Sequence, residues 1–207
     1  MSKIFNYTKG YDVIKFDTIG ACLPGYASTL APIFASFAGI VADDYVENGQ
    51  LVKVVRDTTG KMNALTIKGI VANDAATAVA GVVMSDLKGQ HFINDSGVQY
   101  VYQTAKGQTA TVLRNGYIWV PVQNTTPTIT KGGTVYMRNV AGAASTAQQY
   151  YPIGGIESVA DSGKNVALTN FEFTGLVGFP CTGQNNGTTT TGLTGRTAQV
   201  KVSLGNL

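Results

Sequence analysis

From residue 50 onward, hydrophobic positions come in short runs separated by turn-forming residues such as Gly, Asn, Asp and Thr. Residues 51–56, 64–71 and 79–84 are three such runs, each dominated by aliphatic side chains. Short apolar runs rich in β-branched residues and bounded by turn residues are typical of strands. The segment DTTGK at residues 57–61 predicts a turn between the first two strands.

The sharpest local signal lies at residues 109–122. The run TATVLR is followed by Asn115-Gly116 and then by YIWVPV. Asn-Gly between two β-rich runs predicts a hairpin, because both residues tolerate the positive φ angles of a type I′ turn. Pro121, near the end of the second run, predicts an edge position or a strand end, because proline cannot donate to a sheet ladder.

Further strands are predicted toward the C-terminus by the same kind of composition. The candidates cover residues 98–103, 134–140, 166–168, 171–173 and 197–204. The sequence thus predicts about nine to eleven short strands, with no convincing long helix and no alternation of strands with helices. That pattern predicts a mainly β fold, an antiparallel β-sandwich or barrel.

Residues 1–45 differ from this pattern, so the sequence predicts two parts: an irregular N-terminal arm at 1–45 and a β domain at 46–207. Within the arm, residues 30–40 fit either a short helix or a buried strand. An aromatic-rich segment without a periodic face is expected to pack along another surface, either the β domain or a neighbouring subunit. The seven aromatic residues of the arm are Phe5, Tyr7, Tyr11, Phe16, Tyr26, Phe34 and Phe37.

Two later segments look like loops, because they contain few apolar residues. They are residues 141–149 and the Gly-, Thr- and Asn-rich residues 182–195. Such a segment cannot bury enough apolar surface to offset the entropy lost when it becomes ordered. The second segment is therefore either an exposed loop or a loop that orders against a partner.

The low charge of the chain favours contacts between proteins over contacts with nucleic acid. Charged residues make up 13% of the sequence and the net charge is +3. Weakly charged surface suits contact with neighbouring subunits, although it also fits a monomer. Lys3, Lys9 and Lys15 are spread out rather than clustered, and a nucleic-acid binder would carry a basic stripe with interleaved aromatic residues.

The sequence offers little that could support catalysis or metal binding. His91 is the single histidine, so a Ser-His-Asp mechanism would have to use it, and no Gly-x-Ser-x-Gly motif is present. Asp43, Asp44 and Glu47 form the tightest acidic group, but they lack the patterned oxygen ligands and the Gly turn of a calcium loop. We therefore expect no catalytic residue, no metal and no cofactor.

The cysteines and the apolar segments of the sequence indicate the cellular setting. Cys22 and Cys181 lie far apart and in no metal-ligand spacing, which leaves free thiols or a disulfide open. The first 20 residues have no apolar signal core. The apolar stretch at residues 27–42 is broken by Pro32 and is too short to span a bilayer. We expect synthesis in a cytoplasm and no membrane partner.

Four aromatic residues at strand spacing leave two interpretations. Tyr100 and Tyr102 share one strand face, as do Tyr117 and Trp119. An exposed set of this kind could form a carbohydrate-binding platform, whereas a buried set would form core or cross-strand pairs. The exposure of Trp119 distinguishes the two.

The order of these features resembles that of the structural cement proteins, which decorate the capsids of tailed phages. The likeness spans about residues 40–205 and rests on VADDYVENGQLVKVV, VAGVVMSD, GQTATVLRNGYIWVPV, TKGGTVYMR and TAQVKVSL in that order. The resemblance implies a β-rich, non-enzymatic domain in the virion, on the outer capsid surface. It also implies a protein that binds the major capsid protein and bridges neighbouring capsomers, as a homotrimer with a dimer as the runner-up.

The alternative to this function is another virion surface module, such as a head-fibre base or a glycan-binding domain. For either function, the N-terminal arm is the predicted interface, because large apolar side chains left uncovered usually mark interaction sites. Alternatively, these aromatic residues complete the core of the β domain. The predicted interface residues are Phe5, Tyr7, Tyr11, Phe16 and Tyr26.

Overall fold

The computed structural model describes residues 25–28, 35–56, 62–85, 103–122, 129–141, 153–182 and 194–205. Within these ranges the fold is mainly β, which confirms the predicted class, and the single helical element is the short 3-10 turn η1 (Ala76–Ala78). The strands are β1 (Ala27–Ser28), β2 (Ala35–Val41), β3 (Tyr45–Glu47), β4 (Leu51–Arg56), β5 (Met62–Gly69), β6 (Gly81–Val83), β7 (Gln103–Ala105), β8 (Thr109–Val122), β9 (Thr134–Arg138), β10 (Ile156–Glu157), β11 (Asn165–Thr182) and β12 (Thr194–Ser203).

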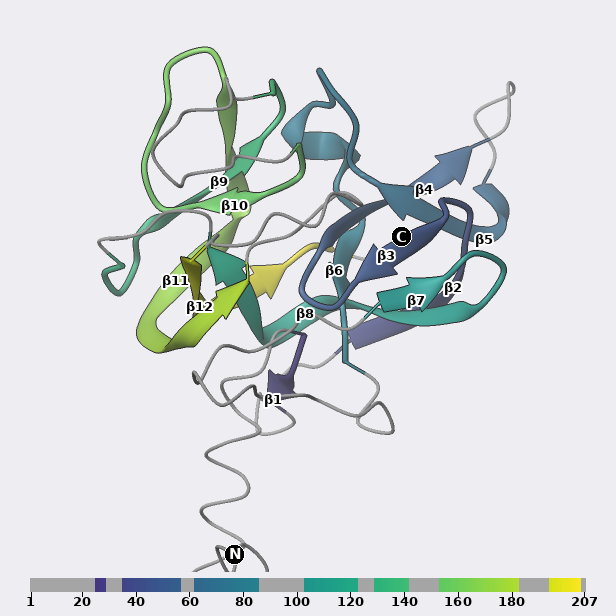
Figure 1. Ribbon diagram of the computed structural model, residues 1–207, viewed down its shortest axis with the longest axis horizontal. Helices are drawn as coiled ribbons and strands as arrows, with labels where there is room; N and C mark the ends of the chain where they lie inside the picture. The colour runs from purple at the N-terminus through teal and green to yellow at the C-terminus, as the bar shows by residue number, and fades with distance from the viewer. Residues whose placement is uncertain are drawn as a thin grey trace, which may run out of the picture.

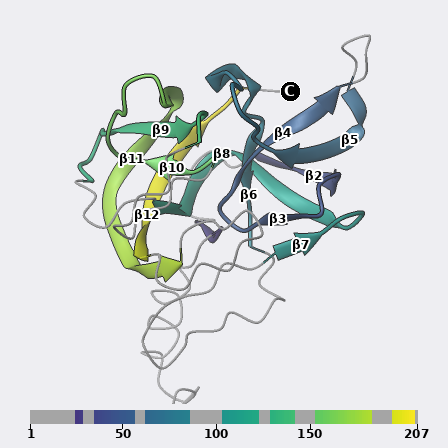
Figure 2. The same cartoon turned by 45° about the horizontal axis from the view of Figure 1, so that its top comes forward.

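Strand β8 organises the whole fold, because two closed circuits of strands share it. In the first ring, the pairing runs from β8 through β2, β5, β4 and β6 and back to β8. In the second ring, it runs from β8 through β12, β11, β9 and β10 and back to β8. Figures 1 and 2 show β8 between these two groups of strands. The predicted barrel is therefore two small rings joined through one long strand, with the first ring on residues 109–115 of β8 and the second on residues 115–122.

Each ring encloses its own apolar core. The core of the first ring consists of Val41, Val46, Val52, Ile67, Val83, Ala110 and Val112, with Phe37 packed against it. The second ring contributes most of a larger cluster, which includes Ile118, Val120 and Val122 of β8. Leu51, Val82 and Leu113, on β4, β6 and β8 of the first ring, also belong to that larger cluster. Because successive side chains of a strand point to opposite faces, these three strands pack on both sides and join the rings.

The hairpin predicted at residues 109–122 was wrong, because these residues form the single 14-residue strand β8. Asn115 does not adopt a positive φ angle, and Gly116 has φ 136, so no type I′ turn is present. The register with β2 instead jumps from Ala35↔Asn115 to Ser36↔Leu113, which leaves Arg114 as an extra residue. Such a bulge bends a strand and increases its twist. Asn-Gly therefore marks the point where β8 passes from one ring to the other.

The C-terminal strands are longer than the sequence predicted. The separate candidates at residues 166–168 and 171–173 both lie in β11, which continues through Pro180 to Thr182. Breaks in the register with β9 and β12 divide β11 locally, and these irregular stretches explain why the pattern looked like separate short strands. Pro121 lies one residue before the end of β8, which confirms the predicted strand end.

The segment expected to be irregular contains regular structure. Residues 35–40 of the stretch that fitted either a helix or a strand lie in strand β2, which pairs with both β8 and β5. Residues 30–34 lie outside the described residues. β3 begins at Tyr45, so residues 35–45 extend into the sheet system. The predicted turn at 57–61 and nearly all of the loops at 141–149 and 182–195 lie outside the described residues.

Candidate functional site

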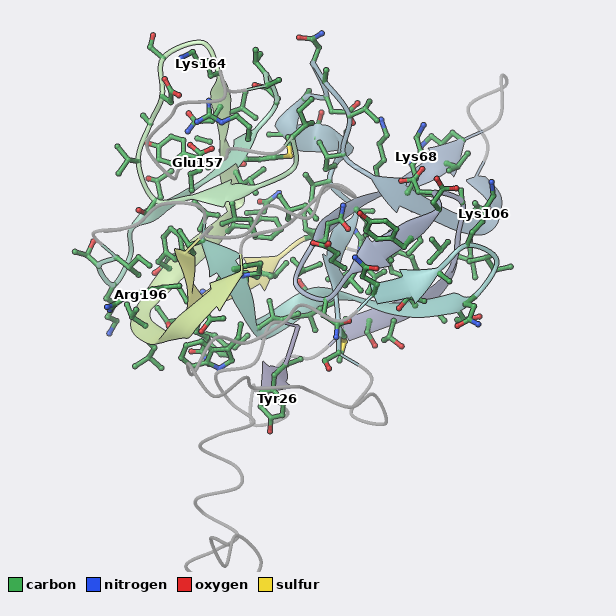
Figure 3. All side chains as sticks on the ribbon, in the orientation of Figure 1. Tyr26, Lys68, Lys106, Glu157, Lys164 and Arg196 are labelled. Carbon is green, nitrogen blue, oxygen red and sulfur yellow. The ribbon has the colours of Figure 1, made fainter. Side chains whose placement is uncertain are left out.

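Among the predicted interface residues, Phe5, Tyr7, Tyr11 and Phe16 lie outside the described residues. Tyr26 is half-buried immediately before β1, and Figure 3 places it at the end of the molecule farthest from Lys164. The Trp119 amide donates to the Tyr26 carbonyl at 3.0 Å, and the Gly25 amide donates to the Trp119 carbonyl at 2.7 Å. Strand β1 then pairs with β8. Residues 25–28 are therefore fixed to the second-ring part of β8.

Trp119 does not form a carbohydrate platform. Its side chain is 5% exposed, and Tyr117 on the same face of β8 is half-buried. Tyr100 and Tyr102 lie outside the described residues. Because a glycan platform requires an exposed aromatic face, the burial of Trp119 favours the alternative that it packs inside the protein.

The acidic group near residue 45 has structural contacts. Asp43 accepts a hydrogen bond from the Gly69 amide at 2.6 Å. Glu47 is buried, and its carboxylate accepts a hydrogen bond from the Gln103 side chain at 3.2 Å. These contacts tie the β3 region to β5 and β7. Among the described residues, no group of three or more His, Cys, Asp and Glu side chains is placed to hold a metal ion.

The remaining candidates for chemistry cannot be placed in a site. His91 and Cys22 lie outside the described residues, and Cys181 lies in β11 without a described side chain. No helix among the described residues is long and apolar enough to cross a membrane.

A basic groove of about 470 Å³ opens on the first ring. It lies between the β4–β5 pair and residues 77–80, and its cationic lining residues are Lys53, Arg56, Lys68 and Arg114. The other described lining residues are Val, Ala and one Thr, so neither a carboxylate nor an aromatic ring occurs among them. Four cations line this groove, whereas a single cation, Lys201, lines the cavity beside residues 132–134 and 167–172.

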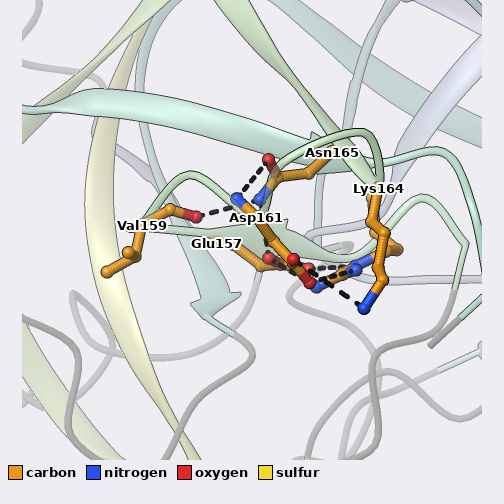
Figure 4. A network of polar contacts seen from close by, with 6 residues as sticks. Glu157, Val159, Asp161, Lys164 and Asn165 are labelled. Atoms are coloured by element: carbon orange, nitrogen blue, oxygen red, sulfur yellow. Dashed lines mark hydrogen bonds and ion pairs between the residues drawn. The ribbon is translucent and has the colours of Figure 1, made fainter. Parts of the chain in front are cut away.

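A buried ionic network lies in the second ring, at the ends of β9, β10 and β11 (Figure 4). Arg138 is 1% exposed and binds both carboxylate oxygens of Glu157, at 2.6 and 2.9 Å. Its third contact is with Asp161 at 2.7 Å, which in turn lies 3.9 Å from Lys164. Asn165 donates to Glu157 at 2.8 Å and accepts from the Asp161 amide at 2.8 Å.

Burial determines the electrostatics of that network. Burial raises the pKa of Glu157, and the contacts with Arg138 and Asn165 offset only part of the rise. Burial acts to lower the pKa of Arg138, but the hydrogen bonds to Glu157 and Asp161 outweigh it and raise the pKa overall. The network fixes the loop between β10 and β11. Its members bind one another, which is the arrangement of a structural site.

Two pairs of apolar residues remain exposed. Ile40 and Leu65 lie on the neighbouring strands β2 and β5, and Leu176 and Val177 lie together on β11. Leu65 also has a φ of 57, in the left-handed region that leucine rarely adopts. Each of these four residues is more than two-fifths exposed, so each pair offers apolar contact area on the surface.

Sequence reasoning found neither the groove nor the ionic network. In each of them, residues from separate parts of the chain converge only through the strand pairings: Arg114 joins Lys53 and Lys68 in the groove, and Arg138 joins residues 157–165 in the network. A weak signal existed for the groove, because Lys53 and Lys68 interrupt runs rich in aliphatic residues. No comparable spacing marks Arg138, Glu157 and Asp161.

Comparison with known proteins gives one family and one fold. The family model for structural cement protein (E217 gp24/Pam3 gp6) in phages matches residues 16–202. A chain in the solved structure of the capsid of Myoviridae phage XM1 has a similar fold, with a TM-score of 0.55 at 20% identity over 88% of this chain and 91% of that chain. No curated protein matches the chain in sequence.

Proposed function

This chain belongs to the phage structural cement proteins, and from that membership we propose that it binds the outside of the head and bridges neighbouring capsomers of the major capsid protein. Membership makes it a structural component of the virion, located on the capsid. The observation that carries the proposal is the family match, which extends over nearly the whole chain.

The described structure supports a role that requires surface contact rather than chemistry. Asp43 and Glu47 are engaged in hydrogen bonds that join strands. The charged groups of the Arg138 network bind one another. The burial of Trp119 argues against the glycan-binding alternative. We therefore propose a protein without enzymatic activity, which stabilises the shell because it binds the assembled state preferentially.

We further propose that the chain acts as a homotrimer, with a dimer as the runner-up, because closed symmetry is the usual arrangement of homo-oligomers. The N-terminal residues Phe5, Tyr7, Tyr11, Phe16 and Tyr26 are its proposed contacts with the capsid or with neighbouring subunits. Mass measurement of the free protein and of the protein on heads tests the oligomer. A monomer in both settings would refute the proposed oligomer.

Co-sedimentation with purified heads that lack this chain tests the main proposal. We expect the full-length protein to pellet with intact heads at a saturating, fixed ratio, and the decorated heads to withstand higher temperature than bare heads. Unassembled capsid protein is the control, since a cement protein should prefer the assembled shell. If the protein remains in the supernatant at all concentrations, the proposed function is wrong.

A further inference from the structure

Two lysines of the basic groove face each other across neighbouring strands, which places like charges close together. Lys53 and Lys68 lie directly opposite each other on the antiparallel strands β4 and β5, and like charges at such positions are destabilising. Asp74 compensates Lys53, since its carboxylate oxygens lie 2.6 and 2.7 Å from the Lys53 Nζ. Within the described part of the chain, Lys68 has no carboxylate partner. One lysine of the facing pair thus remains uncompensated.

Arg114 brings a second such charge to the groove and holds it in a fixed position. Its Nη1 donates to the Ala80 carbonyl at 3.2 Å, while Nε and Nη2 donate to the Gly205 carbonyl at 3.0 and 2.6 Å. These three bonds go to carbonyl oxygens, and no carboxylate among the described residues forms an ion pair with Arg114. Burial lowers the pKa of Arg114, because a desolvated guanidinium without a counter-charge is unfavourable. A carboxylate entering the groove would relieve that cost.

We infer that this groove binds a carboxylate-rich segment of the capsid shell, with Lys68 and Arg114 as the cations that meet its Asp or Glu side chains. The inference rests on the proposed function, because that function makes the capsid the partner. Charge complementarity is the physical reason, since a positive groove and an acidic segment attract each other and fix the register of docking. The Val and Ala side chains that line the groove provide apolar contact for the same segment.

The composition of the groove favours an acidic protein segment over nucleic acid. Single-stranded nucleic acids are held by aromatic side chains on which bases stack, and none occurs among the described lining residues. Duplex binding depends on many phosphate contacts along an extended basic surface, whereas four cations here surround one groove. A short acidic segment suits such a confined site, because Lys68 and Arg114 both line the same groove.

Reversal of one groove charge in the full-length protein tests the inference. Lys68→Glu should weaken binding to undecorated heads by at least about tenfold, because it places like charge against the acidic segment. Lys68→Gln should show a smaller loss in the same direction. The matched control is Lys106→Glu, which changes the net charge equally at an exposed turn outside the groove (Figure 3). It should bind heads within about twofold of the unaltered protein.

Poly-L-glutamate and duplex DNA, supplied at equal charge concentration, identify the ligand class. We expect poly-L-glutamate to bind the unaltered protein and to lose affinity with Lys68→Glu. If Lys68→Glu is folded and binds heads like the unaltered protein, the groove inference is wrong while the proposed function stands. If neither the unaltered protein nor any variant binds heads, the proposed function fails. The groove is then tested by poly-L-glutamate: binding that Lys68→Glu weakens supports an acidic ligand, and binding that Lys68→Glu leaves unchanged contradicts it. If duplex DNA binds more tightly than poly-L-glutamate and Lys68→Glu weakens that binding, the inference of an acidic protein ligand is wrong.

Discussion

Replacing Arg138 with Met should destabilise the fold strongly near neutral pH. The substitution removes the cation that binds both oxygens of the buried Glu157 carboxylate and replaces it with an apolar side chain. Removal of one partner from a buried ion pair typically costs about 3–5 kcal/mol, because the other charge remains buried and uncompensated. For a chain of this length, that loss corresponds to a drop in melting temperature on the order of 10 °C.

The loss should depend on pH in a direction set by Glu157. Burial already raises the pKa of this carboxyl, and Arg138 is the main group that lowers it, so Arg138→Met should raise the folded-state pKa further. Stabilisation by the protonated side chain is then fully present below the unfolded-state pKa of about 4.3 and is lost as the pH rises through the higher folded-state value. The variant should therefore be least impaired in mild acid and most impaired at neutral and higher pH.

Urea unfolding followed by the fluorescence of Trp119, the single tryptophan, measures the effect, because that side chain is buried in the folded protein. Arg196→Met, at an exposed position of β12, is the matched control and should change the free energy of unfolding by less than about 0.5 kcal/mol. The double variant Arg138→Met/Glu157→Gln should recover part of the loss, because the carboxylate that had lost its cation is also removed. A folded Arg138→Met protein that loses less than about 1 kcal/mol, or whose loss does not vary with pH, would refute the reasoning.

Three further predictions use the same unfolding assay or the capsid-binding assay. Gly81→Ala should cost about 1–3 kcal/mol, because its Cβ would lie 2.3 Å from the Leu113 carbonyl oxygen, whereas Gly205→Ala, with nothing within 4 Å, should be nearly neutral. Gly116→Val should cost about 1–3 kcal/mol, because φ is 136 at the β8 bulge; an unchanged melting temperature would show that the bulge tolerates a side chain. Deletion of residues 2–20 should leave the melting temperature similar and weaken capsid binding, whereas unfolding or aggregation would place that segment in the core.

The sequence predicted those parts of the fold that local pattern controls. Residues 51–56 form the predicted strand without a change of boundary, and its first two residues, Leu51 and Val52, are buried. The Asn115-Gly116 signal failed because it reports only what two residues tolerate locally. The conformation adopted there is determined by the pairing of β8 with β2 on one side of the bulge and with β12 beyond it.

The candidate surfaces were harder to predict, because they depend on distant contacts. Arg114 reaches the groove only because its guanidinium is anchored by Ala80 and Gly205, and neither position stands out in the sequence. Lys68 faces Lys53 only through the register of β4 and β5, and no carboxylate of the described residues forms an ion pair with it. Of the seven aromatic residues of the N-terminal arm, Tyr26 and Phe37 lie within the described residues. Phe37 packs against the first-ring core, which fits the alternative that such residues complete the core.

The shared strand β8 also affects the order in which the chain can fold during synthesis. All five strands of the first ring come from residues 35–122, so they have left the ribosome while the second ring still lacks β9 to β12. The second ring closes only when β12, at residues 194–203, pairs with a β8 that is already held by its neighbours. We expect the first ring to act as the template for the second, because domains fold from the N-terminus as they emerge. A nascent chain arrested after β8 should therefore already protect the first ring from proteolysis.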